Sequence, residues 1–129
     1  MVKSGEPGND NITVGARGES IAAAYLRGQK FIIVERNFRC KAGEVDIIAR
    51  DGKVFVFVEV KTRRTLSFGP PQASVTPFKQ RQISKAALTW LAKKRLVDVG
   101  ARFDVIAILL RDHSVPQIDH IRNAFDLAY

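Results

Sequence analysis

The hydrophobic and polar positions of this chain separate helical segments from extended ones. Apolar residues recur at helical spacing after Thr13 and after Pro77, whereas the segments between are rich in β-branched and aromatic residues. Thr13 fits an N-cap and Gly28 the residue that ends a helix, while Thr76 and Pro77 fit the start of a helix that continues to Arg95. The predicted strands are residues 31–38, 43–50, 53–61, 102–110 and 115–121.

The order α-β-β-β-α-β-β predicts an α/β fold, with a mixed central sheet of about five strands flanked by two main helices. Residues 1–11 contain Gly, Pro and Asn without apolar periodicity, and we expect them to form a disordered tail. The remaining residues, 12–129, have the length of a single domain. Residues 62–76 predict a long Gly- and Pro-containing loop with basic residues near its start.

The segment at residues 43–61, GEVDIIARDGKVFVFVEVK, predicts two strands joined at Asp51-Gly52, a dipeptide favoured in type I′ turns. A two-residue turn at this position pairs Asp46 with Phe57. Because side chains alternate between faces, the charged residues then share a face with Phe57, and the apolar ones form a core-facing side. The charged face carries Glu44, Asp46, Glu59 and Lys61, and the core-facing side carries Val45, Ile47, Val54, Val56, Val58 and Val60.

In this register Asp46 is a diagonal neighbour of Glu59, and at about 7–8 Å between such positions the two carboxylates can converge on one ion. Like charges so close destabilise a sheet unless a positive group compensates for them. Mg²⁺ typically takes one or two carboxylates together with water and phosphate oxygens, and Lys61 can offset the charge or hold an attacking water. The alternative is an ordinary solvent-facing sheet face, above all for Glu44.

Glu19 lies on the small and apolar face of the first expected helix, beside Gly15, Ala22, Ala23 and Leu26. A lone buried carboxylate is costly, so this face is expected to pack near the charged side of the hairpin and to bring a third carboxylate there. The alternative is a partly exposed glutamate near a helix N-terminus, where the helix dipole stabilises negative charge.

The composition, 46% hydrophobic and 26% charged, is typical of a folded protein. We expect no membrane span and no secretory signal, and the single Cys40 excludes an internal disulfide framework, so a cytoplasmic protein is expected. The formal net charge of +8 favours nucleic acid as the partner, with a basic protein that binds none as the alternative.

Basic residues border the hairpin and stand at the start of the second helix, where phosphate contacts are expected. These residues are Arg39, Lys41, Arg63, Arg64 and Lys79. Trp90 has the spacing of a core residue, and Asp104 is expected to accept hydrogen bonds in a structural role. His113 and His120 lack the spacing of metal ligands and are expected at the surface.

The order of these residues resembles a known pattern. An acidic residue in the first helix, then Asp46, then a Glu-Val-Lys run that starts at Glu59 after a hairpin, resembles the PD-(D/E)XK nuclease superfamily. The segments GARGESIAAAYL, RNFRCKAGEVDIIARD and VFVEVKTRR, followed by Lys79, more closely resemble the uncharacterised YraN family, placed among resolvase-like nucleases. The match covers residues 14–110, and it implies a restriction-endonuclease-like fold similar to that of Holliday-junction resolvases.

By this resemblance the protein is a metal-dependent endonuclease that hydrolyses phosphodiester bonds of nucleic acid, with DNA as the expected substrate. Asp46 and Glu59 would bind Mg²⁺ or Mn²⁺, Lys61 would assist the water nucleophile, and Glu19 would complete the acidic cluster. A homodimer is expected for paired cuts, because a small domain carries one active site.

Two residues depart from the pattern of the superfamily. Val45 precedes Asp46 in place of the proline in the superfamily's name, and Ser20 follows Glu19 where archaeal resolvases carry a basic residue. Specificity for four-way junctions is therefore not implied. A non-catalytic nucleic-acid-binding module with the same fold is the alternative function, and a regulatory or assembly subunit is a third.

Overall fold

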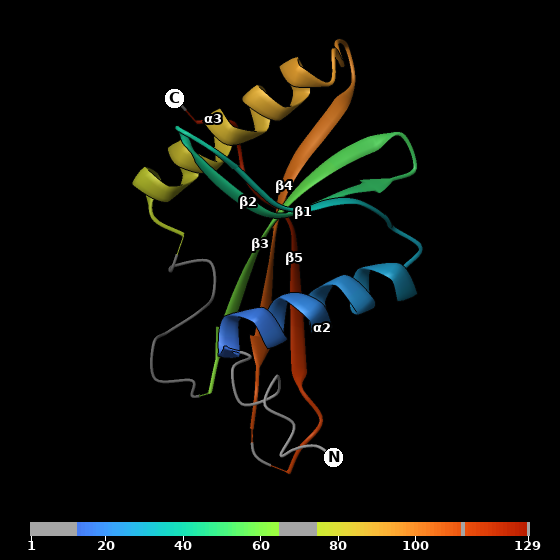
Figure 1. Ribbon diagram of the computed structural model, residues 1–129. Coiled ribbons are helices and arrows are strands. Elements are labelled where there is room, and N and C mark those ends of the chain that lie inside the picture. Colours follow the sequence, from blue (N-terminus) through green and yellow to red (C-terminus); the bar gives the residue numbers. More distant parts are fainter. Residues whose placement is uncertain (1–12, 65–74, 112, 129) are drawn as a thin grey trace, which may run out of the picture.

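The computed structural model describes residues 13–64, 75–111 and 113–128 (Figure 1). Within them the elements follow the predicted order α-β-β-β-α-β-β, and the α/β class with a mixed sheet and two helices is confirmed. The disordered tail expected at residues 1–11 lies outside the described residues, as does most of the loop expected at residues 62–76. The helices are α2 (Val14–Gly28) and α3 (Pro77–Lys93), and the strands are β1 (Ile32–Cys40), β2 (Gly43–Asp51), β3 (Val54–Arg63), β4 (Gly100–Leu109) and β5 (Gln117–Phe125).

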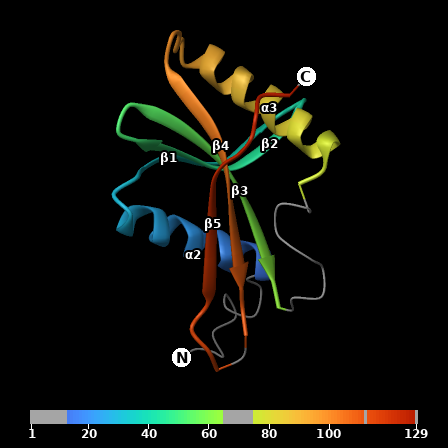
Figure 2. The ribbon, with the colours of Figure 1, turned by 180° about the vertical axis from the view of Figure 1, so that it is seen from behind.

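The strands form one five-stranded sheet in the order β1-β2-β3-β4-β5. Neighbouring strands are antiparallel except β3 and β4, which are parallel because α3 carries the chain back between them. Helices α2 and α3 lie on opposite faces of the sheet, as Figures 1 and 2 show from the two sides. Neither helix is long and apolar enough to cross a membrane, in the part of the chain that the structure describes.

Two hydrophobic clusters, one beneath each helix, hold the layers together. The α2 cluster includes Ala22, Leu26, Ile47, Val58 and Ile106, and the α3 cluster includes Ile48, Phe57, Ile83, Trp90 and Phe103. The prediction of one core-facing side for the hairpin is therefore wrong: Phe57 is 1% exposed because α3 covers the second face as well. Trp90 is a core residue, as predicted, and its indole N–H donates to Glu35 Oε1 at 2.9 Å.

Both helices begin as predicted. The hydroxyl oxygen of Thr13 accepts a hydrogen bond from the backbone N–H three residues on at 3.0 Å, and Thr76 caps α3 in the same way ahead of Pro77. Helix α2 ends at Gly28, as predicted, but Gly28 is not the left-handed glycine that was expected just beyond the helix. The left-handed conformation beyond the helix belongs to Lys30, with φ 73°.

The turn between β2 and β3 also differs from the prediction. Asp51 pairs with Val54, so Gly52 and Lys53 form the turn instead of Asp51 and Gly52. Of these two residues only Gly52 has a positive φ, +61°, whereas a type I′ turn needs a positive φ at both central positions. The turn is displaced by one residue, so every residue of β2 has a partner two positions further along β3 than predicted.

Candidate acidic site

The acidic site forms where the ladder between β2 and β3 ends. The last described pair on this side is Ile47 with Val58, and the carboxylate of Asp46 then accepts a hydrogen bond from Val60 N–H at 2.8 Å. Asp46 and Glu59 stand just beyond this last pair, and in the observed register they are not the diagonal neighbours that the predicted turn implied. A hydrogen bond joins the two carboxyl groups.

Two further details of the predicted hairpin are wrong. Phe57 pairs with Ile48, not with Asp46, because the turn is displaced. Val45 was expected on the same side as Ile47, yet it packs in the α3 cluster while Ile47 packs in the α2 cluster. The ladder between β2 and β3 ends at Ile47, and Asn37 of β1, which lies between the β1 partners of Val45 and Ile47, has a φ of 56°, so regular alternation is lost here.

Glu59 is 5% exposed and lies among positive charges. The Nζ atom of Lys61, on the same strand, is 3.4 Å from Glu59 Oε2, and that of Lys79, in the first turns of α3, is 3.9 Å from the same oxygen. Both lysine side chains are about one-third exposed or less, at 26% and 31%. The structure therefore brings the predicted Lys79 to the acidic pair from a distant part of the chain.

Burial and, after it, the negative charge of Asp46 raise the pKa of Glu59 to about 7, against the opposing effect of Lys79 and Lys61. Burial also raises the pKa of Asp46, against the hydrogen bond from Val60. The pair therefore retains a proton close to neutral pH. Even with two lysines beside Glu59, the site lacks enough positive charge to keep both carboxyl groups ionised.

Glu19 approaches the pair from α2. Its side chain is 15% exposed, as expected for the inward face of the helix, and Arg36 Nη2 of β1 lies 3.6 Å from Glu19 Oε1. Burial and then the charge of Asp46 raise the pKa of Glu19, while Arg36 and a hydrogen bond with Asn37 lower it. The sequence did not single out Arg36, because its contact depends on how β1 and α2 pack together.

The chemistry of the donors fits a hard divalent ion. Asp46 and Glu59 supply carboxylate oxygens, which Mg²⁺ and Mn²⁺ prefer, and a site short of positive charge is one that a cation stabilises. Among the described residues, no group of three or more His, Cys, Asp or Glu side chains is arranged to hold a metal ion. An ion held here would therefore complete its coordination with water and phosphate oxygens. That Glu19 supplies a third carboxylate to the site stays a prediction.

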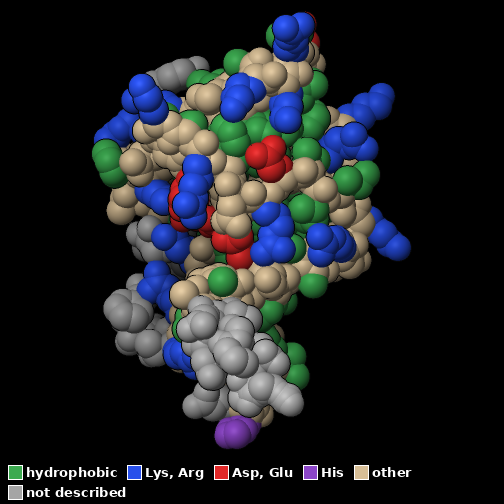
Figure 3. Space-filling view, in the orientation of Figure 1, with side chains coloured by type: hydrophobic (Ala, Val, Ile, Leu, Met, Phe, Trp, Pro, Cys, Tyr) green, Lys and Arg blue, Asp and Glu red, His purple; other side chains and the backbone are tan. Residues whose placement is uncertain are grey.

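Two hollows border the acidic site, and Arg39 lines both. One, of about 610 Å³, also exposes Glu19, Arg36 and Asn37, and the other, of about 330 Å³, also exposes Lys79. Arg39 is 75% exposed, and its Nε lies 3.3 Å from Glu44 Oε2 at the outer end of the hairpin. Figure 3 shows red acidic side chains enclosed by blue basic ones on this face of the molecule.

The other predicted basic residues stand at the ends of strands. Lys41 is exposed in the turn between β1 and β2, Arg63 is half-buried at the end of β3, and Arg64 is exposed just beyond it. Gln80, the neighbour of Lys79, donates its side-chain amide to the Val75 carbonyl at 3.0 Å, which is a structural contact.

Asp104 is the buried acceptor that the sequence predicted, with none of its surface exposed. Burial alone would raise its pKa, but hydrogen bonds from His120, Arg102 and the Asn123 N–H together hold the pKa below its ordinary value. The surface location predicted for His120 is wrong. Its side chain is 5% exposed, with Nε2 2.8 Å from Asp104 Oδ2 and Nδ1 3.2 Å from the Tyr25 hydroxyl. His113 is exposed, as predicted.

The fold and this site define an α/β protein in which a half-buried Asp46 and a buried Glu59 form a carboxylate pair where the second and third strands of a mixed sheet stop pairing. The uncharacterised protein family UPF0102 matches residues 18–108, and the chain belongs to this family, in agreement with the resemblance to the YraN-like uncharacterised proteins. The matched range includes every residue of the acidic site.

Three relatives illustrate the range of similarity. A UPF0102 protein of Geotalea uraniireducens is 74% identical over 120 residues, which cover 93% of this chain and 94% of the relative. One of Geobacter sulfurreducens is 62% identical over 125 residues, with 97% and 98% covered. One of Rhodococcus opacus is 47% identical over 115 residues, with 89% and 98% covered. These names describe no activity, so a function has to be argued from the site.

Proposed function

We propose that this protein is a metal-dependent endonuclease that hydrolyses phosphodiester bonds in nucleic acid, with DNA as the substrate and Mg²⁺ or Mn²⁺ as the ion. The observation that carries the proposal is the Asp46–Glu59 pair, in which both carboxyl groups keep raised pKa values although Lys61 and Lys79 lie beside Glu59. A buried site with this deficit of positive charge favours a divalent cation. The resemblance to the PD-(D/E)XK superfamily supports the same reading.

A bound ion would lower the pKa of a water molecule and polarise the phosphate. The residues of the chain supply positioning and charge. The hydrogen bond from Val60 N–H holds the Asp46 carboxylate in one orientation. Lys61 Nζ, 3.4 Å from Glu59, is placed to orient the attacking water or to stabilise negative charge that develops on the phosphoryl oxygens. Lys79 and Arg39, at the mouth of the site, are placed to hold the phosphate backbone.

The experiment is cleavage of duplex, single-stranded and branched DNA in Mg²⁺, in Mn²⁺ and in EDTA. Asp46→Asn and Lys61→Ala should each lose activity about 10²-fold or more, the typical effect of removing one group that stabilises the transition state. Asp119→Asn and Lys53→Ala are matched controls, since both residues are exposed and lie outside the acidic site. Cleavage that survives EDTA, or that survives Asp46→Asn, would overturn the proposal.

A second function is a nucleic-acid-binding module that does not cleave. It is favoured by the absence, among the described residues, of a three-ligand metal group, and by the ion pairs that Glu59 forms with Lys61 and Lys79. In that case nucleic acid binds with an affinity that depends on salt and that neither Mg²⁺ nor Asp46→Asn changes. Binding and cleavage assays on the same preparations separate the two functions.

A further inference from the structure

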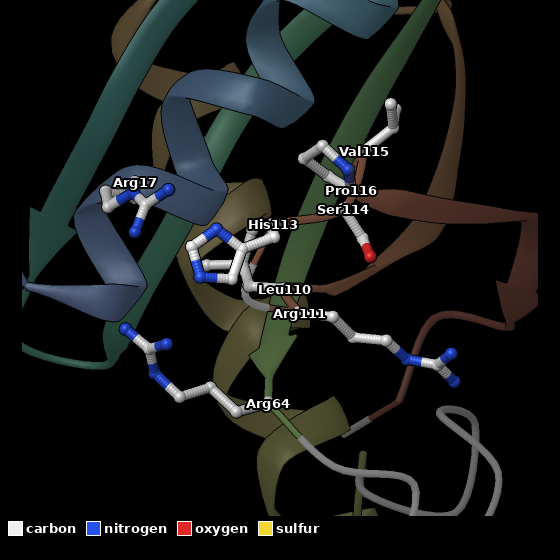
Figure 4. Close-up of a pocket in the computed structure, with 8 residues that line it drawn as sticks. All are labelled: Arg17, Arg64, Leu110, Arg111, His113, Ser114, Val115 and Pro116. Carbon is white, nitrogen blue, oxygen red and sulfur yellow. The ribbon is translucent and has the colours of Figure 1, made fainter.

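A second concave site lies at the carboxyl ends of the parallel strands β3 and β4, on the side of α2 (Figure 4). Its volume is about 420 Å³, and its lining includes Arg17, Arg64, Arg111, His113 and Ser114. No acidic side chain is among the described residues that line it. In open α/β sheets, ligands bind outside the carboxyl ends of the strands, which is where this basic pocket lies.

The sheet itself brings two of the arginines together. Parallel pairing between β3 and β4 continues to Arg63 and Leu109, and the Leu110 N–H donates to the Arg63 carbonyl at 2.8 Å. The two strands therefore end side by side, and Arg64 and Arg111 leave the sheet at neighbouring positions.

The third arginine comes from the first turns of α2 because this helix lies very close to β3. A Cβ atom added to Gly18 would lie 1.8 Å from Thr62 Oγ1, so only glycine permits the observed approach. Thr62 stands two residues before Arg64, and Arg17 precedes Gly18. The close contact between helix and strand thus holds Arg17 beside the end of β3.

The side chains converge on one part of the basic pocket. In Figure 4 the guanidinium groups of Arg17 and Arg64 point to the same side, with the ring of His113 between them, whereas Arg111 extends away. Guanidinium groups bind phosphate through two parallel hydrogen bonds, and this geometry is why arginine recurs in phosphate sites. The arrangement therefore has the chemistry of a site for a phosphate group.

We infer that the basic pocket of Arg17, Arg64 and His113 binds a backbone phosphate of the nucleic-acid strand that enters the acidic site. The inference rests on the proposed function in one respect, that the ligand is a nucleic acid. It does not require that the protein cleaves this ligand. Glu59 and Arg64 are five residues apart on one extended segment, or about 16 Å. The basic pocket therefore contacts a phosphate a few nucleotides along the strand from the one in the acidic site.

The test is binding of fluorescently labelled duplex and single-stranded DNA in EDTA, measured by anisotropy from low to moderate salt in an Asp46→Asn background that cannot cleave. Adding Arg17→Ala and Arg64→Ala together should weaken binding tenfold or more and should reduce the slope of log affinity against log salt by up to about 2. Adding Arg111→Ala alone should have a smaller effect, since its side chain points away. Arg27→Ala, an exposed arginine at the other end of α2, is the matched control and should change the affinity less than twofold.

Inorganic phosphate is a second probe, followed by amide chemical shifts at constant ionic strength. Shifts are expected in the first turn of α2, at Arg64 and at Ser114, and they should disappear in the double variant. If phosphate binds in the basic pocket but the double variant binds DNA as tightly as its parent, the pocket is a site for an adventitious ion only. That result would overturn the inference. An equal loss of affinity in Arg27→Ala would also overturn the inference, because a general electrostatic field would then explain the binding.

The outcomes separate this inference from the proposed function. Pocket-dependent DNA binding by a protein that cleaves nothing in any metal would support the inference and reject the nuclease. If the protein cleaves DNA in a metal-dependent way, and the Arg17 and Arg64 substitutions leave DNA affinity unchanged, the nuclease is supported and the inference is rejected. Thermal unfolding of each variant shows whether the fold is retained, which is expected because Arg17 and Arg64 are exposed.

Discussion

Glu59 combines deep burial with a carboxyl neighbour, and its pKa of about 7 stands above the ordinary value of 4.5. The folded state therefore binds a proton that the unfolded state has already released between these pH values. The resulting contribution to stability is complete below pH 4.5 and is lost as the pH rises through 7. Asp46 and Glu19 act in the same direction, because their pKa values are also raised.

We predict that the metal-free protein becomes less stable between pH 4.5 and pH 7, by at most a few kcal/mol at about 1.4 kcal/mol for each pKa unit. Glu59→Gln should flatten this dependence because it removes the titrating group. Urea unfolding in EDTA across this range measures the effect, with Asp119→Asn as the control. Asp104, whose pKa is lowered, acts only at lower pH, where its protonation removes stability. An identical slope in Glu59→Gln and in wild type would contradict the prediction.

A metal ion should displace the proton that the carboxyl pair retains. We predict that Mn²⁺ binds the wild-type protein and binds Asp46→Asn or Glu59→Gln at least tenfold more weakly, because each substitution removes one charged donor. Binding near neutral pH should release a proton, since ligands must be deprotonated. Calorimetry in buffers of different ionisation enthalpy measures both quantities. Binding of equal strength in Asp46→Asn would place the ion elsewhere.

At the scale of the elements, the acidic site and the basic pocket both depend on the close packing of α2 against β3. Gly18 lies against Thr62, and Glu19 and Arg17 stand on either side of Gly18 in the chain. The helix therefore positions one residue for each site through a single contact with the strand. A change at this contact should affect both sites together.

We predict that Gly18→Ala lowers the free energy of unfolding by about 1–3 kcal/mol, because its Cβ would overlap the Thr62 side chain. Gly15→Ala is the matched control on the same helix. There a Cβ would meet only Thr13 Oγ1 at 3.9 Å, and the gain in helix propensity should stabilise the protein by up to about 1 kcal/mol. Urea unfolding of both variants is the measurement. Equal effects of the two substitutions would show that the contact with β3 is unimportant.

At the scale of the whole molecule, the formal net charge of +8 should make binding of nucleic acid strongly dependent on salt. We predict that log affinity falls linearly with log salt concentration, and that Lys79→Ala and Arg39→Ala each reduce the slope by about 1. Lys53→Ala, in the turn far along the hairpin, is the control. An affinity that is indifferent to salt would exclude phosphate contacts as the source of binding.

If the protein makes paired cuts in a duplex, two copies must act together, since the acidic site of one chain serves one strand at a time. Light scattering during size-exclusion chromatography, with and without duplex DNA, should then detect a homodimer. A strict monomer that introduces only single-strand nicks would contradict the expectation of a dimer while leaving the nuclease intact.

Local physics determined much of this protein from its sequence. The alternation of Val54 to Val60 defined a strand, and the caps at Thr13 and Thr76 placed the starts of both helices, because both signals depend on residues within a few positions of each other. The same local order brought Asp46, Glu59 and Lys61 to attention as a possible site. These features need only the intrinsic preferences of the backbone.

Long-range packing decided the rest. A turn displaced by one residue changed the register of β2 against β3, α3 buried Phe57 and delivered Lys79, and the pairing of β5 with β4 buried His120. The basic pocket depends on segments that end together only after the sheet has formed and α2 has docked on it. Strand register, burial and convergence are properties of contacts between distant segments, so no periodicity within a single segment can specify them.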